Sequence, residues 1–396
     1  MSEILRSDEE LAGWRALADG SCAGLLEAVN AIGDLEAITV AELSALRALA
    51  LPRQVARALE LVRSRRRAIG KLADSESWLL DREGLEQASG TLVAQYKARR
   101  FVELGVDRVL DLCCGVGADA RELTAMLPAA DVLAVDLDPL RTMMTAHNAG
   151  CRVEVADVRD LDLGAAALHV DPARRVEGGG GRRWRLKDHR PGPEFLSPLC
   201  VRQAPAAIKL GPGIDFGELP EFAATEIEIL GTERGLVQAV VWCGPIAHAA
   251  GLRTATRVDR GLSFRARPRS LPVDPALRRY LVVPEPALER AGLVAARVPE
   301  LAELAPGLGL CSVDAPLPDP WFRNYEILES VAWRNDRIAA ALARQDVGAL
   351  TVKIRGKVAD ANEAQRRWQG NGSQSLVLFG FRQGTSARAI IARESS

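Results

Sequence analysis

One stretch decides the fold of this chain: Val109-Leu110-Asp111-Leu112-Cys113-Cys114-Gly115-Val116-Gly117-Ala118-Asp119. A short apolar run ends in an acid, and a turn with two glycines then leads into apolar residues at helical spacing. This order predicts a strand, a tight turn and a helix, an arrangement in which a nucleotide-like ligand lies across the carboxyl ends of parallel strands. Gly115 and Gly117 allow the backbone to approach a ligand closely or to take positive φ.

The acid at Asp111 indicates which ligand the turn accepts. A pyrophosphate group needs unobstructed N–H groups at the start of a helix, and a carboxylate there would repel it. The Gly-x-Gly-x-x-Gly fingerprint of dinucleotide sites also fits poorly, because Cys113 and Ala118 occupy its first and third glycine positions. A ligand with an ammonium and a sulfonium group would be attracted, and S-adenosylmethionine has both. The alternative is a glycine turn that only connects the strand to the helix.

Three more predicted strands end in an aspartate. The strands cover residues 131–136, 151–157 and 167–171, and their final residues are Asp136, Asp157 and Asp171. Because the carboxyl ends of parallel strands meet at one edge of a sheet, these acids are expected to line the same edge as Asp111. Asp136, at the end of the neighbouring strand, is suited to bind ribose hydroxyls.

With these four acids the chain resembles the class I S-adenosylmethionine-dependent methyltransferases over about residues 95–260. The resemblance implies a Rossmann-like sheet and S-adenosylmethionine as the cofactor. It assigns Asp111 and the turn 113–117 to the methionine end, Asp136 to the ribose and Asp157 to the adenine amino group. At Cys113 the family often has glycine. The expected cofactor-binding residues are therefore Asp111, Cys113, Gly115, Gly117, Asp136 and Asp157.

The residues after the fourth strand bear on the methyl acceptor: Asp171-Pro172-Ala173-Arg174-Arg175. In amino-group methyltransferases of this fold the motif is an acid or asparagine, two prolines and an aromatic residue. There the acid and a backbone carbonyl accept hydrogen bonds from the target amine, and the aromatic ring stacks on a flipped base. The resemblance makes Asp171 and Pro172 the catalytic residues. Because Ala173 and Arg174 depart from the motif, methylation of an exocyclic base amine is less strongly indicated.

Three basic residues are expected to bind the substrate. Arg174 and Arg175 follow the catalytic motif, and Lys209 lies at the end of a fifth predicted strand, which together with its turn covers 205–213. A guanidinium group can stack on a base or bind a phosphate. The alternative for all three is an ion pair with a neighbouring acid.

Three domains are predicted. Residues 1–88 form a helical domain, in which Pro52 begins a helix that runs to residue 67. Residues 89–270 form the methyltransferase domain, where Ser89 is a candidate cap for a helix over 90–101. Its remaining strands are expected at 225–230, 237–242 and 253–259, of which 237–242 could equally be helical.

Residues 271–396 are predicted to form a small α+β domain. The expected elements are strands at 280–286, 350–355, 375–381 and 387–392 and helices at 287–294, 325–343 and 361–368. This order resembles the THUMP-like carboxyl-terminal domain of some bacterial methyltransferases. The segments that carry the resemblance are 280–286, 321–329 and 351–356.

Composition excludes several classes of protein. No apolar stretch approaches the roughly 20 residues of a membrane span, and the amino terminus lacks a signal pattern, so a cytoplasmic protein is expected. The seven cysteines are scattered and the four histidines form no metal-binding motif, so neither a disulfide framework nor a metal site is predicted. A net charge of −1 gives no general sign of nucleic-acid binding.

The sheet-edge acids, Asp171-Pro172, the arginines that follow and a basic THUMP-like tail together favour an RNA substrate of the tRNA or rRNA class. Residues 331–396 contain eleven Lys and Arg residues against five Asp and Glu residues. Such a segment is either a solvated face or a nucleic-acid contact surface. The alternatives are a methyltransferase acting on a small molecule or a protein, and a cofactor-binding module without catalysis. DNA is not an expected partner, and the oligomeric state is left open.

Overall fold

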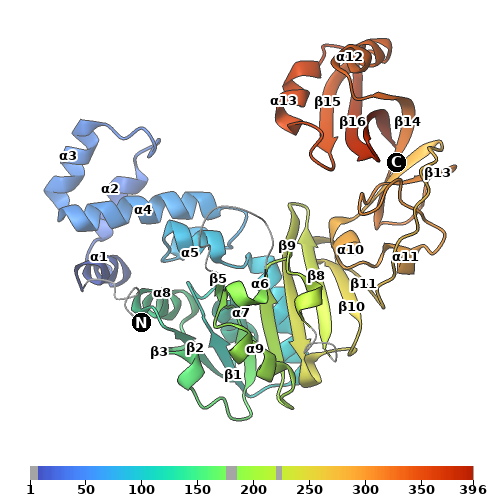
Figure 1. Cartoon of the computed structure of the whole chain (residues 1–396). Helices are drawn as coiled ribbons and strands as arrows, with labels where there is room; N and C mark the ends of the chain where they lie inside the picture. The colour runs from blue at the N-terminus through green and yellow to red at the C-terminus, as the bar shows by residue number, and fades with distance from the viewer. Residues whose placement is uncertain (1–7, 175–184, 220–224, 396) are drawn as a thin grey trace. The chain divides into compact units, whose positions relative to one another are not determined.

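A computed structural model describes residues 8–174, 185–219 and 225–395 of the chain (Figure 1). The chain divides into two compact units. The first holds residues up to 230 together with 237–251 and 258–260, and the second holds 231–236, 252–257 and 261–396. The predicted boundary at 88/89 lies within the first unit, and the three-domain division stays a prediction. None of the helices in the described ranges has the length and apolar character that crossing a bilayer requires.

The first unit begins with the predicted helices. They are α1 (Asp8–Ala18), α2 (Ala23–Asn30), α3 (Val40–Leu49) and α4 (Pro52–Ala68). Thr39 and Glu42 form a capping box at the start of α3, and Pro52 takes the first position of α4, where its missing N–H costs nothing. The apolar faces of these helices meet around Trp14, which is fully buried.

The basic run at 63–67 holds this helical region together. Arg66 donates hydrogen bonds to the carbonyls of Asn30 and Ile32, where α2 ends and its last carbonyls lack helical partners. Arg65 donates to the carbonyl of Trp78 at 2.7 Å. These arginines are therefore engaged in the fold.

A largely parallel sheet forms the rest of the first unit, as predicted. Its strands here are β1 (Arg108–Leu112), β2 (Asp131–Asp136), β3 (Arg152–Val155), β4 (Ala167–Val170), β7 (Ala206–Leu210), β8 (Glu226–Thr232) and β9 (Gly235–Cys243), in the order β8-β9-β7-β4-β1-β2-β3. All pairs from β7 to β3 are parallel, and β9 runs antiparallel to β7. The chain leaves β1 for β2 on one side and returns to β4 on the other, so a ligand crevice is expected at the carboxyl ends of β1 and β4.

Helices connect these strands. They are α5 (Arg82–Gln87), α6 (Thr91–Leu104), α7 (Ala118–Met126), α8 (Pro139–Ala149) and α9 (Pro193–Cys200), and β5 (Ala173–Arg174) pairs with β6 (His189–Arg190) after β4. Short 3-10 helices lie at Ser75–Ser77, Val158–Asp160, Leu186–Asp188, Phe216–Glu218, Gly244–Ile246 and Val258–Arg260. The helix α6 packs on the sheet through Val93 and Phe101, against Val240 and Trp242 of β9.

The second unit is built around another sheet. Its strands are β12 (Tyr280–Pro284), β13 (Cys311–Val313), β14 (Phe322–Ala332), β15 (Val347–Ile354), β16 (Gln374–Gln383) and β17 (Ser386–Ser395), in the order β13-β12-β14-β17-β16-β15. Only β15 and β16 are parallel. The hairpin β10 (Arg253–Arg257) and β11 (Leu262–Ala266), and the short helices α10 (Pro286–Arg290) and α11 (Val294–Arg297), precede this sheet or lie within its connections.

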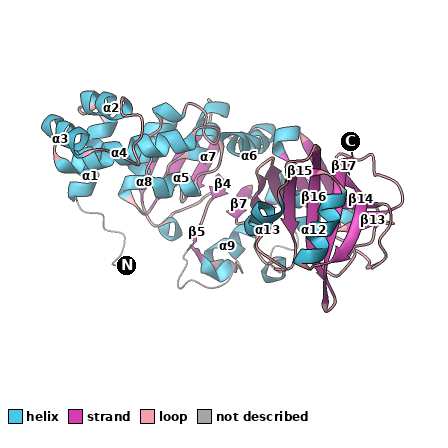
Figure 2. Ribbon diagram, turned by 90° about the horizontal axis from the view of Figure 1, so that it is seen from above, coloured by secondary structure: helices cyan, strands magenta, loops and turns pink. Residues whose placement is uncertain are grey.

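Two helices cover one face of that sheet, α12 (Asn335–Arg344) and α13 (Ala361–Trp368) (Figure 2). Ile338 and Leu342 of α12 and Trp368 of α13 pack in one cluster with Leu378 and Ile391 of the central strands. The βαβ connection from β15 through α13 to β16 explains the single parallel pair, since parallel strands need such a crossover.

One predicted helix was wrong. The segment 325–343 was expected to be helical, but its first part belongs to β14 and α12 begins only at Asn335. Tyr325, Leu328 and Val331 recur every third residue, which mimics a helical face. In the structure β14 pairs with β12 on one side and β17 on the other, and this pairing outweighs the local pattern. The segment 237–242, left open between strand and helix, is a strand.

Candidate functional site

The turn after β1 contains three residues in the left-handed conformation. Their φ angles are +60° at Cys113, +58° at Gly115 and +80° at Gly117. A cysteine in this conformation is strained by about 1–2 kcal/mol. The position therefore demands glycine-like geometry although the chain has cysteine there.

Asp136 joins this turn to the end of β2. Its two carboxylate oxygens accept the N–H groups of Gly115 and Asp138, each at 3.0 Å. Burial raises the pKa of Asp136, and the two backbone hydrogen bonds counteract this. Next to it Leu137 leaves 48% of its surface exposed, at the same strand end. Sequence reasoning missed this apolar side chain, which sits beside the acid expected to hold the ribose.

Four strand-end acids converge on the turn. The pKa of the Cys113 thiol is raised well above its usual value, first by burial and then by the charges of Asp136, Asp171, Asp111 and Asp157. The structure thus brings together the predicted acids from four different strand ends. Among them Asp157 is engaged with Arg159, whose Nη2 lies 2.6 Å from Asp157 Oδ2, and this arginine lowers the pKa of Asp157. Its contact with an adenine amino group stays a prediction.

Asp111 lies in a buried polar network. Only 1% of its surface is exposed, and its Oδ1 is 2.7 Å from Nδ1 of His169, its cross-strand neighbour in β4. The other oxygen, Oδ2, is buried and has no hydrogen-bond partner in the described part of the chain. Nε2 of His169 is 3.0 Å from Nζ of Lys97, which pairs with Asp119 at 2.7 Å.

Sequence reasoning missed His169 and Lys97, although both carried a signal. His169 interrupts an apolar strand, and a buried polar group needs a partner. Lys97 lies midway between Val93 and Phe101 at intervals of four, so it falls on the buried stripe of α6. Ser89 was expected to cap this helix, but Gly90 takes that position and the Ser89 hydroxyl donates to Asp119 at 2.8 Å.

The predicted catalytic acid is paired with a predicted substrate-binding residue. Nζ of Lys209 lies 2.6 Å from Oδ2 of Asp171 and also donates to the carbonyl of Gln87 at 3.2 Å. The ion pair expected as the alternative for Lys209 is therefore present. Pro172 is buried.

The predicted substrate arginines are less defined. The backbone of Arg174 pairs with His189 in the ribbon of β5 and β6, and Arg175 lies outside the described residues. Their roles toward a substrate stay predictions.

Hydrogen bonds and close packing hold the segment before α6 against the turn that follows β1. Asn148 of α8 accepts the N–H of Leu79 and donates to the carbonyls of Leu79 and Val116. A Cβ at Gly84 would lie 2.2 Å from Cγ1 of Val116, so only glycine fits there. These contacts hold α5 against the turn and place the carbonyl of Gln87 beside Lys209.

Replacement of Gly117 by alanine is expected to lower the free energy of unfolding by about 2–4 kcal/mol, because strain and overpacking add. The new Cβ would take φ +80° and lie 2.9 Å from Thr145. The control is Gly105→Ala, where φ is +67° and no atom lies within 4 Å, so only the conformational cost of about 1–2 kcal/mol is expected. Urea unfolding measures both, and equal losses would contradict the close contact.

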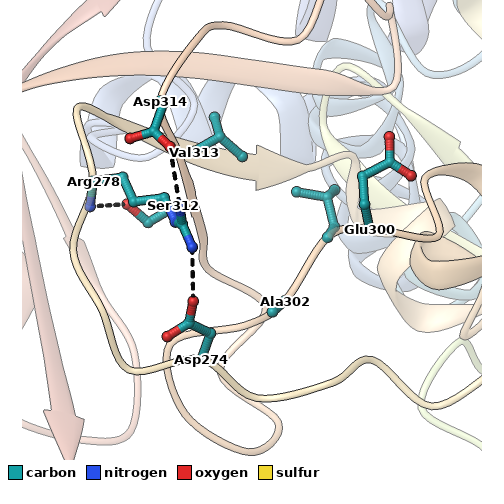
Figure 3. A pocket seen from close by; sticks show the side chains of 8 residues that line it. Asp274, Arg278, Glu300, Ala302, Ser312, Val313 and Asp314 are labelled. Atoms are coloured by element: carbon teal, nitrogen blue, oxygen red, sulfur yellow. Dashed lines mark hydrogen bonds and ion pairs between the residues drawn. The ribbon is translucent and has the colours of Figure 1, made fainter.

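A separate pocket of about 230 Å³ lies in the second unit (Figure 3). Arg278 lies between two acids of its lining, Asp274 at 3.1 Å and Asp314 at 2.9 Å. Its charge is thus balanced within the pocket. The lining contains no glycine turn and none of the acids at the carboxyl ends of the parallel strands, so the pocket does not compete with the β1 turn as the candidate site.

The residues around the turn fit S-adenosylmethionine. The unpartnered oxygen of Asp111 suits a cation, and the exposed side chain of Leu137 suits the flat face of an adenine ring. Asp136, at the same edge, would hold ribose hydroxyls. When bound, the cofactor supplies an electrophilic methyl group on its sulfonium, while these residues bind and orient it.

Comparisons with known proteins agree with this fit. No family model matches the chain. Two curated relatives, from two strains of Mycobacterium tuberculosis, are 33% identical over 344 residues, which cover 82% of this chain and 91% of each relative. Both are uncharacterized S-adenosylmethionine-dependent methyltransferases.

A solved structure shares the fold over the whole chain. It is a Porphyromonas gingivalis protein assigned as a methyltransferase, with a TM-score of 0.66, 18% identity and 100% coverage of both chains. This likeness concerns the fold alone, whereas the Mycobacterium relatives show the family. The chain therefore belongs to the S-adenosylmethionine-dependent methyltransferases and uses S-adenosylmethionine as its cofactor.

Proposed function

We propose that this methyltransferase acts on RNA, of the tRNA or rRNA class, and that its second unit includes a THUMP-like domain that binds the RNA. The observation that supports this is the surplus of cations near the carboxyl terminus, where residues 331–396 contain eleven Lys and Arg residues against five acids.

The acids of this segment leave much of that charge unbalanced. Asp336 pairs with Arg334 at 3.0 Å, and Glu363 pairs with Arg367 at 2.7 Å. Five further side chains make no hydrogen bond or ion pair with any residue that the structure describes: Lys357, Arg366, Arg382, Arg388 and Arg393. A polyanionic backbone would supply the missing counter-charges, with release of its bound counterions.

Asp171 has the position and charge to receive the acceptor nitrogen. Its Oδ2 is held by Lys209, its side chain is 30% exposed, and Oδ1 has no partner within the described ranges. Oδ1 would accept a hydrogen bond from the N–H of the acceptor and then take the proton that the methylated nitrogen releases. Methyl transfer otherwise needs alignment and exclusion of water, which the fixed edge of the sheet provides.

Two other functions compete with this proposal. A small molecule or a protein as acceptor is favoured by Arg174, which stands where base-methylating relatives have an aromatic ring. A module that binds cofactor without catalysis would retain the turn and Asp136 but would not need Asp171.

The test incubates the full chain with methyl-labelled S-adenosylmethionine and with separate RNA, protein and metabolite fractions. Label in RNA, together with RNA binding that weakens steeply with salt, is the expected result. Label in another fraction, or binding to RNA that does not respond to salt, would refute the proposal.

Replacement of Arg382 and Arg393 by glutamine is expected to weaken RNA binding and to reduce the slope of log affinity against log salt by about one per lost phosphate contact. The matched control replaces Arg334 and Arg367, which are exposed but already paired with acids. An equal loss in both double variants would contradict the role of the unpaired cations. Filter binding at several salt concentrations measures the slopes.

A further inference from the structure

A network of polar side chains connects β1, β4 and β7 near the turn that is expected to bind the cofactor. Asp111 of β1 and His169 of β4 are cross-strand neighbours, and Asp171 directly follows the last residue of β4. Asp171 in turn pairs with Lys209, the penultimate residue of β7. The carboxylate expected at the cofactor is thus in register with His169, and the one expected at the acceptor follows His169 by two residues.

Lys97 of α6 and Asp119 of α7 extend this network. Lys97 of α6 lies 3.0 Å from Nε2 of His169 and 2.7 Å from Oδ1 of Asp119, at the start of α7. Ser89 lies 3.2 Å from the Lys97 ammonium and donates to Asp119. Since Nδ1 of His169 faces the Asp111 carboxylate, the proton of a neutral imidazole is on Nδ1, and Nε2 accepts from Lys97.

Such a cluster is costly for stability. Lys97, Asp111 and His169 are each 1% exposed, and burying a charged group costs several kcal/mol even when it is paired. Apolar side chains of similar volume would pack at least as stably in this position. The retention of ionisable groups here therefore points to a role in the site rather than in the fold.

One negative charge in this cluster has no counter-charge in the ranges that the structure describes, and it is the charge of the Asp111 carboxylate. Lys97 and Asp119 balance each other, so with a neutral His169 the charge on Asp111 is not neutralised. Its Oδ2 is also the oxygen that lacks a hydrogen-bond partner among the described residues. Burial raises the pKa of Asp111, so an added positive charge beside its carboxylate would stabilise the ionised form.

We propose that Lys97 and His169 are positioning residues, which fix the Asp111 carboxylate so that its free oxygen receives the ammonium group of S-adenosylmethionine. Lys97 orients the imidazole, and the imidazole holds Oδ1 of Asp111. The proposal depends on the cofactor and not on RNA as the acceptor, so its failure and that of the RNA proposal are separate results.

Two ligands separate this role from a structural one. S-adenosylhomocysteine has the ammonium group, whereas 5′-methylthioadenosine has the same adenine, ribose and thioether without it. Calorimetry on the full chain is expected to show that Lys97→Met and His169→Leu weaken S-adenosylhomocysteine about ten- to hundredfold and leave 5′-methylthioadenosine unchanged. His169→Asn, whose amide nitrogen can replace Nδ1 as donor to Asp111, is expected to retain most of the affinity for S-adenosylhomocysteine.

Binding by the unaltered chain should also depend on pH. As the pH falls through the raised pKa of Asp111, the protonated carboxyl no longer attracts the ammonium, so S-adenosylhomocysteine weakens more than 5′-methylthioadenosine, which depends only on the raised pKa of Asp136 at the ribose. The titratable groups that face Asp111 are His169 from β4, Lys97 from α6 and Asp119 from α7. Equal weakening of both ligands in the variants, or no weakening of S-adenosylhomocysteine, would overturn the proposal. Thermal unfolding of each variant identifies a general loss of folding, which affects both ligands alike.

Discussion

Replacement of Arg100 by methionine is expected to lower the free energy of unfolding by about 3–5 kcal/mol, because it leaves uncompensated charge in the interior. Nη1 and Nη2 of Arg100 each lie 2.8 Å from a carboxylate, those of Glu226 and Glu228 respectively. Both glutamate side chains are fully buried. The guanidinium also lies 4.2 Å from the centre of the Trp242 ring, whose N–H donates to Glu228, so the variant loses a cation–π contact as well.

Urea unfolding measures this loss, and two variants test its cause. Arg152→Met removes an exposed pair with Asp131 and is expected to cost less than about 1 kcal/mol. Arg100→Met combined with Glu228→Gln should be less destabilised than the two single changes predict when added, since each removes a partner of the other. Strict additivity, or a loss no larger than that of Arg152→Met, would show that the buried pair does not hold α6 to β8.

Replacement of Asp171 by asparagine is expected to slow methyl transfer about 10²- to 10⁴-fold, the usual contribution of a positioned proton acceptor. Asparagine retains the shape and one acceptor oxygen but cannot take the proton from the acceptor nitrogen. It also leaves the ammonium of Lys209 without its anion at 2.6 Å. Initial rates with labelled cofactor measure this loss of activity, with whichever of the RNA, protein and metabolite fractions the unaltered chain methylates.

Cofactor binding separates this defect from a general one. Asp171→Asn should bind S-adenosylhomocysteine as the unaltered chain does, whereas Asp136→Ala should bind it weakly and so raise the cofactor concentration needed for half-maximal rate. Asp136 ties the turn to β2 through Gly115, so its removal loosens the cofactor side of the site. Normal turnover by Asp171→Asn would refute the role of Asp171 as the proton acceptor.

The sheet and its acids could be predicted because the information is local. Each of β1 to β4 is a short run that ends at an aspartate or within two residues of one, and parallel topology carries all those ends to one edge. The effect of Asp111, Asp136, Asp157 and Asp171 on the Cys113 thiol shows that they do converge. Spacing along the chain was sufficient for this part of the site.

The partners of these acids could not be predicted in the same way. Lys97 and His169 are 72 positions apart, and Lys209 and Asp171 are 38 apart, so each contact depends on how helices and strands pack. The error in β14 has the same origin, because a spacing of three between apolar residues suits a helix until neighbouring strands are available for pairing.

Cys113, a residue of the turn with a left-handed backbone, has a thiol that the cofactor could methylate. A thiol next to an activated methyl group is a rival nucleophile that could be alkylated in place of the substrate, and it is the thiolate form that reacts. At Cys113 burial and four surrounding carboxylates raise the pKa and keep the sulfur protonated. We therefore expect the acids predicted to bind the cofactor to lower the reactivity of this thiol toward its methyl group as well.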